Sequence, residues 1–194
     1  MVAVVRLDGT VPPQQPPRDL VAVCFGSAIS ALAGEDVSRV GNHREIIAEV
    51  DRLETERHPR WVFWSAQAEA QHLVSSGIYL DRCWDIAEAH QLLVGGRSAD
   101  PAMAWATVCR LGTSDLPRPA GGDLFDFTTE DNPGDQGDPE NPVRSDGYLR
   151  PEAVIGTWQT SPARAVAWAR VAADTAKRQM AALSGLSARA VSTG

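Results

Sequence analysis

Residues 59–94, PRWVFWSAQAEAQHLVSSGIYLDRCWDIAEAHQLLV, decide the fold class of this chain. The stretch holds two short runs that suit strands, 61–64 and 78–84, and each is followed by apolar residues at helical spacing. Ser65 and Asp85 stand where helix N-caps are expected, and Gly77 ends the first helix. A strand–helix–strand–helix unit of this length is typical of parallel strands joined by a right-handed crossover. We therefore predict an α/β fold in which these two strands are parallel neighbours.

Three apolar runs precede this unit. Residues 1–7 (MVAVVRL) and 20–25 (LVAVCF) are expected to be strands, and Gly26 allows a tight turn. Residues 27–32 are either a third strand or a short helical turn, and we favour the strand. Between these runs and residue 59, Asn42 with Glu45 three residues later predicts a capped helix, whose buried stripe is Ile46, Ile47, Val50 and Leu53.

The C-terminal part of the chain contains two expected helices and one irregular segment. Asp100-Pro101 begins a helix that runs to about residue 111, and Ser161-Pro162 begins a long helix that ends at Gly185. The segment between them is rich in Pro, Gly and Asp and shows little periodicity, which is typical of a loop. We expect one domain made of residues 1–112 and 158–185, an acidic loop over 113–157 before the last helix, and a linker or cut end over 186–194.

The net charge of −7 comes from the acidic loop. Residues 115–149 hold nine acidic residues against Arg118 and Arg144, so 2 − 9 gives −7. The remainder has 25 − 9 = 16 acidic and 18 − 2 = 16 basic residues and is formally neutral. A neutral body with an acidic loop is a poor clamp for nucleic acid by itself, because contacts to phosphate supply most non-specific affinity.

Cysteine usage and hydropathy indicate the cellular compartment of the protein. The three cysteines are scattered and have no CxxC spacing, which favours a reducing cytoplasm over a disulfide framework or a zinc site. Cys24 and Cys83 fall in predicted strands, where we expect them to be buried and inert. No apolar run reaches the ~18 residues of a membrane span, so we expect a cytoplasmic protein without a membrane partner.

The histidines and tryptophans give no sequence signal for a site. His72 and His90 lie on separate predicted helices without a second His at i+4 or a nearby Cys, so zinc is not expected. Most of the six tryptophans fall in strand or helix stripes, where core packing is the better interpretation.

The order of elements favours a particular arrangement within the α/β class. Three antiparallel strands followed by alternating helix and strand is the order of the ribonuclease H-like fold. We therefore expect a mixed sheet of about five strands flanked by helices.

Four segments also carry a resemblance to a known family. They are PRWVFWSA (59–66), SSGIYLDRCWDIAEAHQLL (75–93), DLPRPAGGDLFDF (115–127) and VAADTAKR (171–178). Together they resemble the 3′-5′ exonuclease-type domain at the N-terminus of family A (polymerase I-like) DNA polymerases. The actinobacterial type of bifunctional 3′-5′ exonuclease/DNA polymerase is the most similar. The resemblance implies a DnaQ-like exonuclease fold, a C-terminal polymerase module, a role in DNA replication and repair, binding of DNA through the full-length protein, and a place at the nucleoid.

The resemblance also implies where catalytic carboxylates would lie. Such domains hold two metals with an Asp-x-Glu at the end of the first strand, an Asn-x-x-x-Asp after the fourth strand and a Tyr-x-x-x-Asp on the last helix. The first pair of positions falls on Val5 and Leu7, with Asp8 shifted nearby. Ser65 and Glu69 stand at the second motif. The third motif places either Ala172 or Asp174 at the Asp position, with Arg170 replacing Tyr in the second register.

The departures from the motif predict a degenerate, inactive exonuclease-like domain that scaffolds the polymerase module and carries no cofactor. Each remaining carboxylate also has an ordinary structural interpretation: Glu69 as a helix-flank carboxylate, and Asp174 as part of a surface ion-pair ladder with Arg170 and Arg178. One alternative is an active two-metal exonuclease on DNA, in which Asp8, Glu69 and Asp174 converge on Mg²⁺ or Mn²⁺.

A second alternative is a non-catalytic interaction module that acts through the acidic loop. Leu124, Phe125 and Phe127 are apolar anchors in a segment that gains nothing by exposing them. They either dock back on the domain or bind a partner. The Leu-Phe pair resembles the end of bacterial sliding-clamp ligands, so the clamp is the candidate partner.

Overall fold

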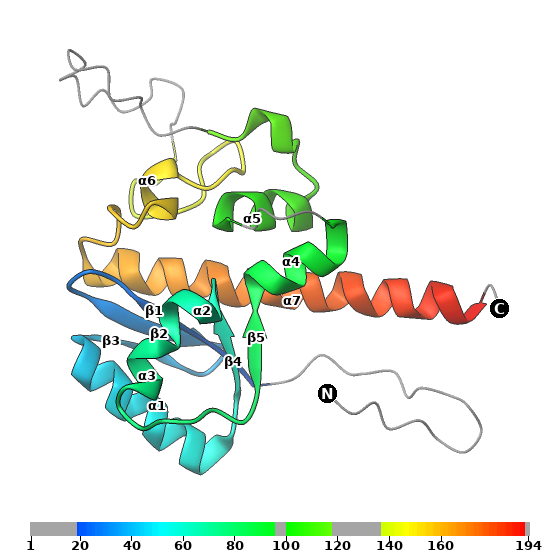
Figure 1. Ribbon diagram of the computed structural model, residues 1–194. Helices are drawn as coiled ribbons and strands as arrows, with labels where there is room; N and C mark the ends of the chain where they lie inside the picture. The colour runs from blue at the N-terminus through cyan, green and yellow to red at the C-terminus, as the bar shows by residue number, and fades with distance from the viewer. Residues whose placement is uncertain (1–18, 96–99, 118–136, 193–194) are drawn as a thin grey trace, which may run out of the picture.

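The computed structural model describes residues 19–95, 100–117 and 137–192. In this part of the chain, five strands form one mixed sheet in the order β3-β2-β1-β4-β5 (Figure 1). The strands are β1 (Leu20–Phe25), β2 (Ser30–Gly34), β3 (Ser38–Gly41), β4 (Arg60–Phe63) and β5 (Cys83–Asp85). The pairs β1–β2 and β2–β3 are antiparallel, whereas β1–β4 and β4–β5 are parallel. The α/β class and the mixed sheet of five strands are confirmed.

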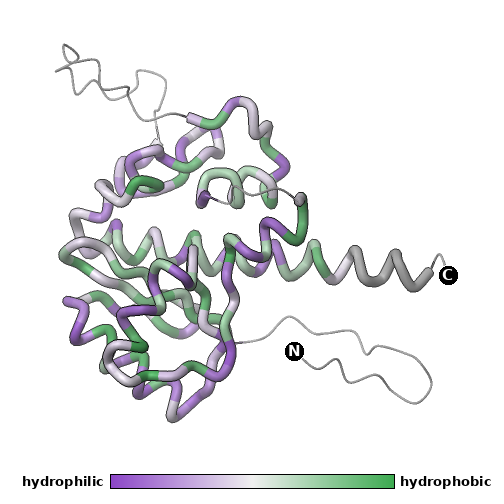
Figure 2. The backbone as a smooth tube through the Cα atoms, viewed as in Figure 1, coloured by the Kyte–Doolittle hydropathy of each residue, from purple (hydrophilic) through white to green (hydrophobic). Residues whose placement is uncertain are grey.

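Helices cover both faces of this sheet. Alternate residues of β1 enter two apolar clusters: Val21 and Val23 pack with α1 (His43–Arg57) and α3 (Gln71–Val74), while Ala22 and Cys24 pack with α7 (Pro162–Ser192). The cluster on the α7 side also includes residues of α4 (Ile86–Val94), α5 (Pro101–Cys109) and α6 (Pro151–Val154). Hydrophilic residues recur along the outer helix α1, and the C-terminal part of α7 runs out beyond the sheet (Figures 1 and 2). No helix in the described ranges is long and apolar enough to cross a membrane.

Four of the five predicted helix starts are confirmed by their capping bonds. Asn42 and Glu45 form the reciprocal capping box of α1, with bonds of 3.0 and 2.9 Å. Asp85 and Asp100 accept hydrogen bonds from the backbone of the third helical residue of α4 and α5. Ser161 does the same for α7. These bonds satisfy backbone N–H groups that a helix leaves unpaired at its first turn.

The N-terminal strands differ from the expectation in two places. Residues 27–32 were expected to be a strand, but the chain first turns at 26–29 and β2 runs from Ser30 to Gly34. The antiparallel partner β3 was not predicted, because it is an exposed strand whose only apolar side chain is Val40. The strand expected over residues 1–7 lies outside the described residues.

The unit over residues 59–94 is also less regular than predicted. The strand expected over 78–84 is limited to β5, because the short strand β4 offers pairing only from Trp61 to Phe63. The first helix is divided into α2 (Ala66–Glu69) and α3. Ser65 makes no capping bond; Asp85 Oδ2 accepts from Ala66 N at 2.7 Å instead. One carboxylate therefore caps both α2 and α4.

Two expectations about the C-terminal half differ from the structure over the described residues. The segment 113–157 is ordered where it is described. It contains the 3₁₀ helix η1 (Thr113–Asp115), a bridge between Val143 and Leu149, and α6. The cause is burial: Leu149 is 2% exposed, and Trp105 Nε1 donates to Gly147 O at 2.8 Å. Helix α7 also continues past Gly185, since one exposed glycine costs a helix only about 1 kcal/mol.

Candidate functional site

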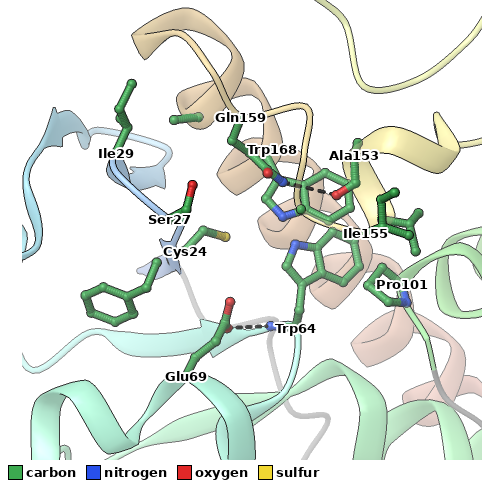
Figure 3. Close-up of a pocket in the computed structure, with 15 residues that line it drawn as sticks. Cys24, Ser27, Ile29, Trp64, Glu69, Pro101, Ala153, Ile155, Gln159 and Trp168 are labelled. Atoms are coloured by element: carbon green, nitrogen blue, oxygen red, sulfur yellow. Dashed lines mark hydrogen bonds between the residues drawn. The ribbon is translucent and has the colours of Figure 1, made fainter. Parts of the chain in front are cut away.

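A cavity of about 240 Å³ lies where the parallel strands β1 and β4 end. The carboxyl ends of parallel strands are the usual location of binding crevices in open α/β sheets. The lining comes from the end of β1, the β4–α2 connection, α6 and α7 (Figure 3). It consists of Cys24, Phe25, Gly26, Ser27, Ile29, Trp64, Glu69, Pro101, Ala153, Val154, Ile155, Gly156, Gln159, Ala165 and Trp168.

The end of β1 contributes the thiol of Cys24 and the glycine Gly26 to this cavity. Cys24 is 6% exposed, and burial, with a smaller effect of Glu69, raises the pKa of its thiol well above the ordinary value. The thiol is therefore protonated at neutral pH and is a poor nucleophile. Gly26 makes the turn after β1, where a Cβ would lie 2.5 Å from the carbonyl oxygen of Ile29. No side chain fits there unless the backbone moves.

Glu69 is the one sequence-predicted site residue that lies in the cavity among the described positions. Its Oε2 accepts a hydrogen bond from Trp64 N at 3.2 Å, which holds the carboxyl group over the β4–α2 turn. Burial raises the pKa of Glu69 to about 8, against the lowering effect of backbone hydrogen bonds from Trp64 and Ser65; Asp85 adds a smaller upward effect. At neutral pH this carboxyl group is mostly neutral.

Two stacked tryptophans form a further part of the wall. Trp64 and Trp168 have ring centroids 4.6 Å apart and planes 28° apart, and both are nearly buried. Trp168 and Ala165 are the lining residues from α7. The last helix thus presents an indole and a methyl group to the cavity, whereas the resemblance would require a carboxylate from this helix.

Gln159 lines the cavity from the segment between α6 and α7. Its Nε2 donates to Ala153 O at 3.1 Å (Figure 3). Its Oε1 is buried and has no hydrogen-bond partner among the described residues. Sequence reasoning missed Gln159, Trp168 and Gly26, because neutral residues in separate segments carry no signal that they share a site.

Both possible registers on α7 leave the cavity without a carboxylate from that helix. Asp174 is not among the lining residues; its carboxylate pairs with Arg178 at 3.1 Å, and that guanidinium lies over the Trp105 ring. Ala172 is fully buried in the apolar cluster on the α7 side. The structure describes neither Asp8 nor the anchors Leu124, Phe125 and Phe127.

The remaining histidines and cysteines of interest lie away from the cavity wall. His72 was expected to stand alone, but its ring lies 5.2 Å from that of His43, and both rings lie against Phe25. His90 is buried, and neither of its ring nitrogens has a partner in the described part of the chain. Cys83 was expected to be buried but is exposed, because β5 is the edge strand.

The donor set does not fit a pair of divalent metals. Such ions need several oxygen ligands, yet the cavity offers one mostly protonated carboxyl group, a protonated thiol and the neutral side chains of Ser27 and Gln159. Over the described ranges, no group of three or more His, Cys, Asp or Glu side chains is placed to hold a metal ion. The cavity is therefore close to neutral, and its wall combines apolar side chains with a few hydrogen-bonding groups.

Comparison with known proteins gives no family assignment. No protein-family model matches the chain, and neither the curated proteins nor the solved structures contain a significant match. Functional inference therefore depends on the geometry of the fold and of this cavity.

Proposed function

We propose that this chain is a catalytically degenerate 3′-5′ exonuclease-like domain of ribonuclease H-like fold that scaffolds a C-terminal family A polymerase module. The observation that carries the proposal is the strand order β3-β2-β1-β4-β5 with its two antiparallel and two parallel pairs. It is the order expected of a ribonuclease H-like sheet. In that order, β1 is the central strand whose end would carry the Asp-x-Glu pair.

With this strand order, the first motif is expected at the end of β1 and not at residues 5–8. The two positions there are Cys24 and Gly26, which both line the cavity. Glu69 follows β4, as the second motif requires, and Trp168 faces the cavity from the last helix. One carboxyl group thus remains of the four that the resemblance implies.

The chemistry of these replacements supports a loss of catalysis. In an active site of this type, two metals activate a water molecule and stabilise the leaving oxygen of the phosphodiester. A protonated thiol at Cys24 and a protonated carboxyl group at Glu69 offer neither the charge nor the ligands for two hard cations. A bulky indole at Trp168 would also compete for the space that a scissile phosphate needs.

The opposite end of the α7 face offers a contact surface for an adjoining module. A groove of about 450 Å³ is formed by α4, α5 and α7, and its lining combines the apolar Leu93, Val94, Val108 and Ala181 with Arg110 and Arg178. The neighbouring Leu92 is 77% exposed. Exposed apolar side chains that gather beside a groove are typical of protein contact surfaces. We propose that the polymerase module packs here, and that the whole protein acts on DNA in the cytoplasm at the nucleoid.

A nuclease assay tests the catalytic part of this proposal. The protein is incubated with Mg²⁺ or Mn²⁺ and a 5′-labelled single-stranded oligonucleotide, and products are resolved by length. We expect no shortening above the level seen with Glu69→Ala protein prepared in parallel. Trimming by the unaltered protein that Glu69→Ala abolishes would contradict the proposal and favour a two-metal exonuclease.

The scaffold part has a separate test. The coding sequence downstream of Gly194 is expected to encode a family A polymerase module. A stop codon or an unrelated module at that place would refute the scaffold role, whatever the result of the nuclease assay.

A further inference from the structure

The cavity at the ends of β1 and β4 holds two buried polar atoms that have no partner in the described part of the chain: Trp64 Nε1 and Gln159 Oε1. An unmade hydrogen bond at a buried donor or acceptor is costly, so native proteins leave few of them. Trp64 is only 6% exposed, and Figure 3 shows its indole nitrogen directed into the same space as Cys24, Glu69 and Gln159. A donor and an acceptor are thus presented to one small volume.

The orientation of both groups is fixed by the surrounding structure. Stacking on Trp168 holds the Trp64 ring. The hydrogen bond from Gln159 Nε2 to Ala153 O sets the amide direction, because the reversed amide would place two oxygens against each other. The fold therefore presents N–H and C=O groups to the cavity at fixed places, as a binding site requires.

The other polar groups of the cavity carry little charge at neutral pH. Burial keeps the Cys24 thiol protonated and raises the pKa of Glu69 to about 8. No Lys, Arg or His lines the cavity. Such a space has nothing to neutralise a phosphate or a carboxylate, and it lacks the negative charge that would attract a cation.

We propose that this cavity binds a small neutral cyclic amide, whose C=O accepts from Trp64 Nε1 and whose N–H donates to Gln159 Oε1. A cyclic amide holds its carbonyl and N–H on the same edge, so one flat group carries the acceptor and the donor that these two protein atoms need. The cavity of about 240 Å³ has the volume of roughly eight waters at ~30 Å³ each. That space suits one six- or five-membered ring. This inference goes beyond the proposed function and does not depend on it.

Nuclear magnetic resonance of the tryptophan side chains tests the proposal directly. The sequence has six tryptophans, and the indole N–H signal of Trp64 is assigned by its loss in Trp64→Phe. Uracil and 2-pyrrolidone are titrated separately into the ¹⁵N-labelled protein. We expect the Trp64 signal to shift saturably with at least one probe, with a Kd of about 0.1 to 10 mM, the range open to a ligand of so few atoms. The probe that binds tells whether the site prefers a nucleobase or a simple lactam.

The matched ligand control is 1,3-dimethyluracil, which keeps the ring and the carbonyls of uracil but has no N–H. We expect its binding to be at least about tenfold weaker than that of uracil, the factor that corresponds to ~1.4 kcal/mol. This comparison uses the unaltered protein, so it does not depend on any variant folding.

Two variants complete the test. Gln159→Met removes the acceptor and should weaken binding about tenfold, while Trp84→Phe should leave binding unchanged, since Trp84 Nε1 donates to Gln179 away from the cavity. The remaining indole signals report whether each variant is folded. The proposal is overturned if neither probe moves the Trp64 signal at concentrations up to ~10 mM, which is the result expected of a cavity that holds only water. It is also overturned if 1,3-dimethyluracil binds as well as uracil.

Discussion

Glu69 should make the stability of this protein fall as the pH rises above 5. Burial raises the pKa of this carboxyl group to about 8 in the folded state, against an ordinary value of 4.5. Between these two values the unfolded chain has lost a proton that the folded chain still holds. The contribution of this proton to the free energy of unfolding is therefore fully present below pH 4.5. It is lost as the pH rises toward 8.

The size of the effect follows from the same two values. Each pH unit between them lowers the free energy of unfolding by ~1.4 kcal/mol, or about 4 kcal/mol from pH 5 to pH 8. The Glu69 side chain is half-buried by its exposed surface, so solvent screening reduces this to roughly 2 kcal/mol. The variant Glu69→Gln has the same shape and no titration. It should be close to the unaltered protein in stability at pH 5 and about 2 kcal/mol more stable at pH 8.

Urea unfolding followed by far-ultraviolet circular dichroism at pH 5, 6, 7 and 8 measures this difference. Glu152→Gln is the control, because it removes one negative charge at an exposed side chain on α6. The control should show no comparable trend with pH. A difference between Glu69→Gln and the unaltered protein that stays constant across these pH values would refute the reasoning about burial of the carboxyl group.

Two pairs of substitutions test other features of the fold by urea unfolding. Asp85→Ala removes the caps of α2 and α4 and should cost about 2 kcal/mol, whereas Asp100→Ala, which removes the cap of α5 alone, should cost about 1 kcal/mol; equal costs would argue against the double cap. Gly26→Ala places a Cβ 2.5 Å from Ile29 O and should cost ~2 kcal/mol or more, while Gly185→Ala, which meets open space in α7, should stabilise by ~0.5 to 1 kcal/mol. A neutral Gly26→Ala would show that the turn after β1 accepts a side chain.

The predictions from sequence succeeded where a local interaction decides the structure. A helix start depends on a side chain and a backbone N–H only three residues apart, so the caps at Asn42, Asp85, Asp100 and Ser161 could be predicted. The buried strand β1 was predictable because five of its six residues lie in the core and form a continuous apolar run.

The failures concern structure that distant partners impose. β3 exists because it pairs with β2, although its residues are exposed and lack an alternating pattern. Leu149 lies in a segment with the composition of a loop, yet it is buried in the cluster on the α7 side. The α2 cap comes from Asp85, 19 residues after the N–H that it accepts from. None of these partners can be read from local composition.

The candidate site was only partly predictable for the same reason. Glu69 was identified through the resemblance, which places an Asn-x-x-x-Asp motif after the fourth strand, but the first motif was assigned to residues 5–8. In the structure, the central strand whose end meets Glu69 is β1, and the residues there are Cys24 and Gly26. Neither is a residue type that a search for carboxylates would select. Only the strand order brings them to the place where the resemblance requires a pair of acidic residues.

The neutral character of the cavity gives a physical reason why the replacements belong together. Several carboxylates at one buried site repel each other and lose hydration, and bound metal ions normally offset that cost. If the chain is the degenerate exonuclease-like domain proposed above, loss of one metal ligand would leave the other carboxylates to destabilise the fold. Cys24, Gly26 and Trp168 at the remaining positions would then remove that repulsion. Glu69 persists as a carboxyl group because hydrogen bonding to Trp64 holds it and its raised pKa lets it stay protonated. On this argument, Cys24→Asp should destabilise the protein at pH 8 far more than at pH 5, since a second buried carboxylate beside Glu69 brings back the repulsion without a metal to offset it.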